Sequence, residues 1–247
     1  MPVEPTSEAL LPRLQRSLES VRTAVAEAAR RSGRDPAAVT ILAAGKTVAP
    51  GILALLPRLG VLDVGENRVQ EAEAKVRALS DLGLRWHMIG RLQTNKVRRA
   101  LDLFHRVHSV DRDAIMDSLA AEALRRGRAI DCLLQVNVSD EPTKGGYGPD
   151  AVRSALRRAR SLPSLRVTGL MAIPAPAAEP EGSRAAFRAV RELRDSLREG
   201  KDDLPDLSMG MSGDYAVAVE EGATIVRLGS VLYDEGSGRG LAPPEPR

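Results

Sequence analysis

The sequence has almost no cysteine and very few aromatic residues. Its 247 residues include one cysteine, Cys132, which excludes an intrachain disulfide and is typical of a protein from a reducing compartment. Phe, Trp and Tyr together make up 2% of the residues, so aliphatic side chains must fill the interior. An interior of Ala, Val, Leu and Ile suits parallel strands that are covered by helices.

Long apolar runs are also missing, and neither sign of charge dominates. No stretch approaches the roughly 18 to 20 uninterrupted apolar residues of a membrane span, and residues 1–5 lack the pattern of a signal peptide. Lys and Arg number 36 against 33 Asp and Glu. Basic pairs such as Arg98-Arg99 and Arg157-Arg158 have no stacking aromatic residues between them and are read as solvated helix faces. We expect a cytoplasmic protein that binds neither membrane nor nucleic acid.

What the sequence does contain is a repeated alternation of strand and helix patterns. Residues 7–31 have helical spacing and precede the first strand. Strands are predicted at 40–46, 62–65, 85–89, 106–109, 132–138, 166–171, 207–209 and 224–228, and helices at 51–58, 68–80, 94–100, 112–126, 149–162, 183–199 and 216–221. Such alternation requires right-handed crossovers and a parallel sheet.

About eight such units in roughly 250 residues predict a single (β/α)8 TIM barrel with an extra N-terminal helix. An open, doubly wound sheet is the alternative. The barrel domain is expected to span residues 1–235, and the turn-rich segment 236–247 is expected to be a disordered tail.

Lys46 closes the first apolar strand pattern, where strand meets loop. Ligands bind at this edge in α/β proteins. A desolvated amine there has a lowered pKa and can form a Schiff base with an aldehyde. The alternative is a lysine that simply extends to water.

Polar residues also follow the other predicted strands. Glu66 and Asn67 follow the second, Asp111 follows the fourth, and the loop 144–148 follows the fifth. Asn67 and Asp111 could equally be N-caps of the next helices. Gly-Ser pairs follow strands seven and eight, at Ser212-Gly213 and Gly229-Ser230, where barrels usually bind phosphate.

Arg227 interrupts the last apolar strand, and a buried guanidinium needs partners. It could donate to the ring nitrogen of pyridoxal phosphate (PLP), or it could pair with a neighbouring carboxylate. No metal is expected, because His105 and His108 are at an odd offset that points them to opposite faces of a strand, and no metal-binding motif occurs.

Together these residues resemble the pyridoxal phosphate homeostasis protein family. The segments that carry the resemblance occur in the family's order, namely 45–47 (GKT), 65–71 (GENRVQE), 86–96 (WHMIGRLQTNK), 108–111 (HSVD), 208–214 (SMGMSGD) and 226–230 (VRLGS). Gly45 stands where the family often has serine, and Ser230 where it often has threonine. The resemblance implies the barrel of the alanine racemase N-terminal domain, with PLP held as an internal aldimine on Lys46.

The resemblance also assigns the remaining site. Ser212, Gly213, Gly229 and Ser230 would hold the phosphate, and Arg227 would face the pyridine nitrogen. Asn67 and Met209 would line the pocket, while His87 receives no contact. No metal and no catalytic residue are implied.

The function implied is intracellular PLP (vitamin B6) homeostasis, in which the chain holds PLP and supplies it to apo-enzymes through transient contact. We expect no turnover, because racemisation needs acid/base groups on both faces of the substrate. Alanine racemases resembling this barrel add a second domain that supplies a tyrosine across a dimer, so a monomer is expected here. The alternatives are a PLP-dependent racemase or decarboxylase, and a phosphosugar-type barrel enzyme.

Overall fold

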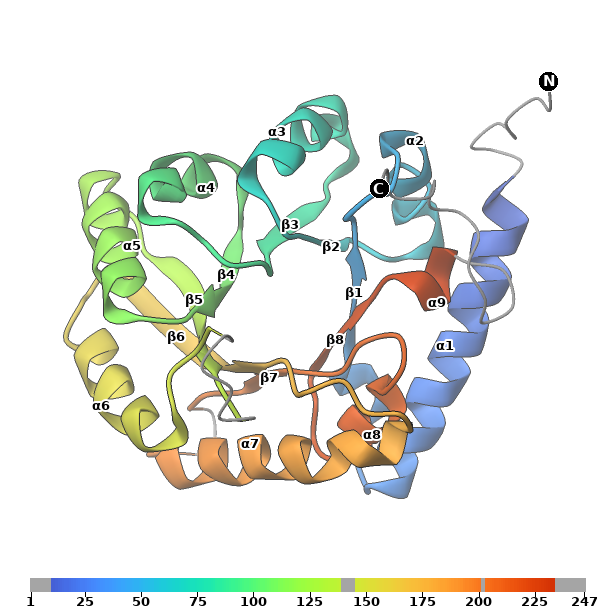
Figure 1. Cartoon of the computed structure of the whole chain (residues 1–247). Helices are drawn as coiled ribbons and strands as arrows, with labels where there is room; N and C mark the ends of the chain where they lie inside the picture. Colours follow the sequence, from blue (N-terminus) through green and yellow to red (C-terminus); the bar gives the residue numbers. More distant parts are fainter. Residues whose placement is uncertain (1–9, 139–144, 201–202, 234–247) are drawn as a thin grey trace.

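The computed structural model describes residues 10–138, 145–200 and 203–233, and it forms a closed barrel of eight parallel strands. The strands follow one another around the barrel in chain order, and β1 pairs with β8 to close it (Figure 1). The predicted (β/α)8 barrel is therefore confirmed. The predicted tail 236–247, the domain boundary at 235 and Lys144 of the predicted loop lie outside the described residues.

Each predicted strand forms, with ends that differ from the prediction by one or two residues. The strands are β1 (Thr40–Ala44), β2 (Asp63–Glu66), β3 (Arg85–Met88), β4 (Arg106–Val110), β5 (Ile130–Val136), β6 (Leu165–Ala172), β7 (Asp206–Ser208) and β8 (Ile225–Leu228). The difference that matters for function is at β1, which ends at Ala44 rather than at Lys46. Residues 45–48 form a turn instead, in which the N–H of Val48 donates to the carbonyl of Gly45.

The helices alternate with the strands around the outside of the barrel. They are α1 (Leu11–Arg31), α2 (Pro50–Leu53), α3 (Val69–Ala78), α4 (Val97–Leu103), α5 (Asp113–Arg125), α6 (Pro149–Arg160), α7 (Arg184–Leu197), α8 (Tyr215–Glu220) and α9 (Ser230–Tyr233). The predicted helix 51–58 is instead α2 followed by a separate 3-10 turn, Pro57–Leu59, because Pro57 cannot continue an α-helix. Among the described residues, no helix is both long and apolar enough to cross a membrane.

Helix α1 is the predicted extra N-terminal helix, and it packs against α8 and α9 (Figure 1). The residues it buries recur every three or four positions, which gives one apolar stripe along the helix: Leu14, Leu18, Val21, Val25, Ala28 and Ala29. The hydrophobic core lies between this outer layer of helices and the strands. It is mostly aliphatic, as the low content of aromatic residues predicts.

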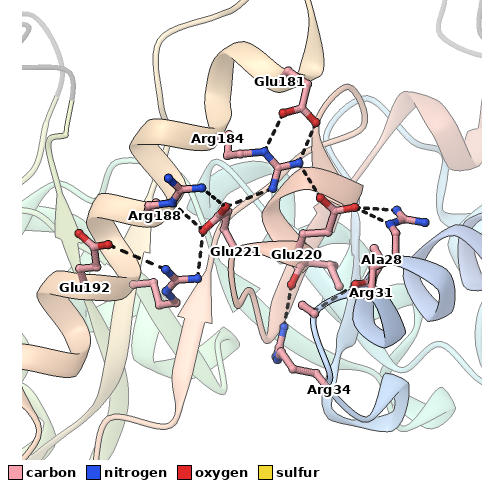
Figure 2. A network of polar contacts seen from close by, with 12 residues as sticks. Ala28, Arg31, Arg34, Glu181, Arg184, Arg188, Glu192, Glu220 and Glu221 are labelled. Atoms are coloured by element: carbon pink, nitrogen blue, oxygen red, sulfur yellow. Dashed lines mark hydrogen bonds and ion pairs between the residues drawn. The ribbon is translucent and has the colours of Figure 1, made fainter.

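A group of ion pairs ties the C-terminal ends of α1 and α8 to α7 (Figure 2). Glu221, buried at the end of α8, accepts from Arg184, Arg188 and Arg191 of α7 at 3.0 to 3.1 Å. Its neighbour Glu220 accepts from Arg184 at 2.5 Å and from Arg31 of α1 at 2.7 Å. These contacts hold the helix that follows β7 in place and so position the loop between them.

The barrel interior is partly polar. A small apolar cluster of Leu42, Ile89 and Ile225 lies inside the barrel. Gly65 makes room for it, since a Cβ there would meet Leu42 Cδ2 at 2.4 Å and Ile89 Cδ1 at 2.7 Å. Five of the strands contribute buried polar side chains: Asp63 from β2, His87 from β3, His108 from β4, Ser208 from β7 and Arg227 from β8.

Candidate functional site

A pocket of about 540 Å³ lies among the residues that follow the C-terminal ends of several strands. Seven of the eight site residues predicted from the sequence line it: Lys46, Asn67, Ser212, Gly213, Arg227, Gly229 and Ser230. The exception is Met209, which is fully buried in the hydrophobic core, whereas Met211 lines the pocket and is 40% exposed. The turn after β7 therefore presents the second of the two methionines to the pocket.

Lys46 reaches the pocket from the turn after β1 and is exposed. Its exposure matches a lysine that extends to water rather than a desolvated amine, and Schiff-base formation by Lys46 stays a prediction. The turn that carries Lys46 is fixed on one side by the backbone of β2, because the N–H of Gly45 donates to the carbonyl of Gly65 at 2.8 Å. The amine is thus accessible, while its backbone attachment is well defined.

Beneath this turn lies a buried ion pair that the sequence analysis missed. Lys75, on α3, donates to Glu66 Oε1 at 2.7 Å and to the carbonyl oxygen of Gly45 at 2.6 Å. Glu66 is fully buried, and its burial raises its pKa, although the contact with Lys75 partly opposes this effect. The pair connects α3 to the residue that precedes Lys46, and no local sequence pattern identifies Lys75 as the partner.

The loops after β7 and β8 meet through the hydroxyl of Ser212. Its Oγ accepts from the backbone N–H groups of Gly229 at 3.1 Å and Val231 at 3.3 Å. The backbone N–H groups of Ser212, Gly213 and Ser230 have no acceptor within the described ranges. Exposed N–H donors gathered at one side of a pocket are suited to an anion, since an anion accepts from several donors at once.

Arg227 contributes a buried guanidinium to the pocket wall. Its Nη1 donates to Ser208 at both the carbonyl oxygen (2.6 Å) and the hydroxyl (2.8 Å), and its Nη2 donates to the carbonyl of Ala172 at 3.0 Å. No carboxylate forms an ion pair with it among the described residues, so the pairing that the sequence left open is not formed. Burial lowers the pKa of Arg227 to about 10, which leaves the guanidinium charged at neutral pH.

Asn67 and Asp111 are not helix caps. Helix α3 begins after Arg68 and α5 after Arg112, and neither helix has a side-chain cap hydrogen bond. Asn67 lines the pocket, where its backbone packs tightly against Gly90, and a Cβ on Gly90 would lie 2.3 Å from the Asn67 carbonyl oxygen. Asp111 pairs instead with the guanidinium of Arg112 at 2.5 Å.

The histidines lie outside the pocket lining. His105 is exposed and lies just before β4, so the predicted opposite faces of one strand do not apply to it, whereas His108 is fully buried within β4. His87 is buried inside the barrel, where it contacts His108 and Asp63. Within the part of the chain that the structure describes, no group of three or more His, Cys, Asp or Glu residues could hold a metal ion.

Known proteins are similar to this chain over most of its length. The family model "Alanine racemase, N-terminal domain" matches residues 17–235. A pyridoxal phosphate homeostasis protein of Aquifex aeolicus is 45% identical over 224 residues, which cover 90% of this chain and 96% of that protein. The protein of the same name from Pseudomonas aeruginosa is 42% identical and covers 88% of this chain and 93% of its own length.

Among solved structures, that of PipY from Synechococcus elongatus with PLP bound has a TM-score of 0.76 and 34% identity. The match covers 89% of this chain and 99% of PipY. The match to the family model, residues 17–235, spans the barrel and includes the turn that carries Lys46 and the loops after β7 and β8. This chain belongs to the pyridoxal phosphate homeostasis protein family, whose barrel is that of the alanine racemase N-terminal domain.

Proposed function

We propose that this chain is a cytoplasmic protein that binds PLP as a Schiff base on Lys46 and supplies it to apo-enzymes. One observation carries the proposal: a single pocket contains an accessible primary amine, a cluster of backbone N–H groups without an acceptor among the described residues, and a buried guanidinium. These three features match the aldehyde, the phosphate and the ring nitrogen of PLP. The relatives named for pyridoxal phosphate homeostasis and the structure of PipY with PLP bound support the same ligand.

The residues present fit each part of this ligand. The amine of Lys46 can condense with the aldehyde and release water, which needs an accessible nitrogen. The N–H groups of Ser212, Gly213 and Ser230 are free to bind phosphate oxygens. Arg227 has only donors, so a ring nitrogen that faces it must accept and is therefore unprotonated. When bound, PLP would supply an electrophilic aldehyde that free amines can attack.

The pocket also supports storage rather than turnover. No His, Cys, Asp or Glu is among the described residues that line it. Tyr233 lines it, but its hydroxyl is buried and has no hydrogen-bond partner among the described residues. A racemase needs proton donors and acceptors on both faces of its substrate, and this lining offers few. Binding and release of PLP, rather than turnover, is the function that these residues serve best.

The absorption spectrum of the protein mixed with PLP, before and after borohydride, tests the proposal. We expect a visible Schiff-base band in the wild type that borohydride reduces and traps on Lys46. Lys46→Ala should lose the band, whereas Lys96→Ala, a change to a lysine outside this pocket, should keep it. Trapping on another lysine would contradict the proposed site.

Delivery and catalysis need their own measurements. The loaded protein should restore activity to a PLP-dependent apo-enzyme, and a chiral assay with alanine should show no racemisation above the level of free PLP. Racemisation that is lost in Lys46→Ala would favour the racemase alternative. Failure to restore the apo-enzyme would limit the function to sequestration.

A further inference from the structure

A continuous chain of buried polar contacts runs from β2 across the barrel interior to the pocket. Asp63 Oδ1 lies 2.9 Å from His87 Nε2, and His87 Nδ1 lies 3.0 Å from His108 Nε2. His108 Nδ1 then lies 2.9 Å from Ser208 Oγ, which accepts from Arg227 Nη1 at 2.8 Å. β4 and β7 are separated by β5 and β6, so the contact between His108 and Ser208 crosses the barrel (Figure 1).

The hydrogen bonds in this chain have a direction, and Asp63 sets it. A carboxylate only accepts, so His87 must donate to it from Nε2. If His87 is neutral, its Nδ1 accepts from His108 Nε2, and His108 Nδ1 in turn accepts from the hydroxyl of Ser208. The oxygen of Ser208 is then left to accept from Arg227. Every member donates toward Asp63.

The surroundings favour neutral histidines. His108 is fully buried, and the charged groups that face it are Arg227 and Arg106, both cations. His87 faces Arg106 and His105 on one side and Asp63 on the other. Burial lowers the pKa of both rings, and Asp63 only partly opposes this for His87. Asp63 is already compensated by Arg85, which donates to its two oxygens at 2.8 Å and 2.5 Å.

We propose that Asp63, His87, His108 and Ser208 are positioning residues, which together orient the guanidinium of Arg227 toward the pocket. The proposal rests on the proposed function for the identity of the ligand. It makes Asp63, which does not itself contact Arg227 among the described residues, a determinant of how tightly a ring nitrogen is bound. If these residues merely filled the barrel interior, their hydrogen bonds would not all have to donate in the same direction.

The histidine signals in a 15N NMR spectrum of the protein without PLP test the direction. We expect both His87 and His108 in the neutral tautomer that carries its proton on Nε2, unchanged between about pH 6 and 8. Asp63→Asn should change the His108 signals and the Arg227 guanidinium signals, although neither residue contacts Asp63. A protonated ring, the other tautomer, or Arg227 signals unmoved in Asp63→Asn would overturn the proposal. The NMR measurement needs no cofactor, so its outcome does not depend on whether the protein binds PLP.

Ligand affinity separates positioning from a merely structural role. Ser208→Ala removes the hydroxyl that links His108 to Arg227, and we expect about tenfold weaker binding of PLP, the effect of losing one charge-assisted hydrogen bond. Binding of a PLP analogue with carbon in place of the ring nitrogen should not change. Ser208→Thr, which keeps the hydroxyl, should restore PLP affinity, and His105→Gln should leave both ligands unaffected. Equal losses for PLP and the analogue would overturn the proposal, whereas failure of the wild type to bind either ligand would instead count against the proposed function.

Discussion

Lys75 and Glu66 form a buried ion pair directly beneath the turn that presents Lys46. The side chain of Lys75 is 12% exposed and that of Glu66 is fully buried, and the same ammonium also binds the carbonyl of Gly45. A helix on the outside of the barrel is thereby connected to the residue next to the proposed PLP-binding lysine.

Lys75→Met should destabilise the protein by about 3–5 kcal/mol, because it leaves the carboxylate of Glu66 buried without a partner. Urea denaturation would measure the loss. The double variant Glu66→Gln/Lys75→Met should recover part of it, since the amide carries no charge. A double variant that is as unstable as the sum of the two single changes would show that the pair is not coupled.

Gly90→Ala should weaken PLP binding about tenfold, which corresponds to roughly 1.4 kcal/mol. A Cβ at this position would lie 2.3 Å from the carbonyl oxygen and 2.7 Å from the Cα of Asn67, so the backbone of a pocket residue must move. Titration of the Schiff-base band with PLP is the measurement. Gly148→Ala is the matched control, because a Cβ there meets nothing within 4 Å. Equal affinities in the two variants would mean that Asn67 does not contribute to the site.

Stability should fall as the pH drops below about 6.5, the ordinary pKa of histidine. The folded-state pKa values of His87 and His108 are lowered by burial, so the unfolded chain takes up protons first and the stability present above pH 6.5 is lost on acidification. Each proton contributes at most about 1.4 kcal/mol per pH unit. Asp63 adds a further loss below its ordinary value of 3.8, because hydrogen bonds from His87 and Arg85 lower its pKa despite its burial.

Urea denaturation at a series of pH values would record this profile. His108→Gln should reduce the slope below about pH 6.5, because it removes one group whose pKa is lowered by burial. Burial raises the pKa of Glu66, so Glu66 makes the stability change in the opposite direction, but its contribution is the same in the wild type and in His108→Gln and cancels in their difference. A His108→Gln profile parallel to that of the wild type would contradict the neutral, buried state of His108.

Glu221→Gln should destabilise the protein by about 2 kcal/mol, because it removes the carboxylate that three arginines of α7 share. We expect less than for a fully buried pair, since the arginine side chains are 27% to 52% exposed and water screens them. Glu73→Gln, at an exposed pair with Arg77, is the control and should change stability by less than about 0.5 kcal/mol. Both values can be measured from thermal or urea unfolding, and similar losses in the two variants would argue against a special role for Glu221.

The sequence by itself was sufficient for the fold and for most of the pocket. Strand and helix patterns are local, and eight of them in alternation have few arrangements other than a closed parallel barrel. Once the barrel is accepted, residues that follow different strands, such as Lys46, Asn67 and Arg227, must meet at one end. Their convergence could therefore be predicted from their positions in the repeat alone.

Only the tertiary structure decided which side chains contact one another. Periodicity assigns a residue to a face of a strand or helix, but it does not select a partner from another element. Lys75 pairs with Glu66, and His108 contacts Ser208 across the barrel, and no local sequence pattern predicts either contact. The turn after β7 is decided in the same way: the strand ends at Ser208 and the chain turns at Gly210, whose φ is 88°, so that Met209 packs in the core and Met211 lines the pocket.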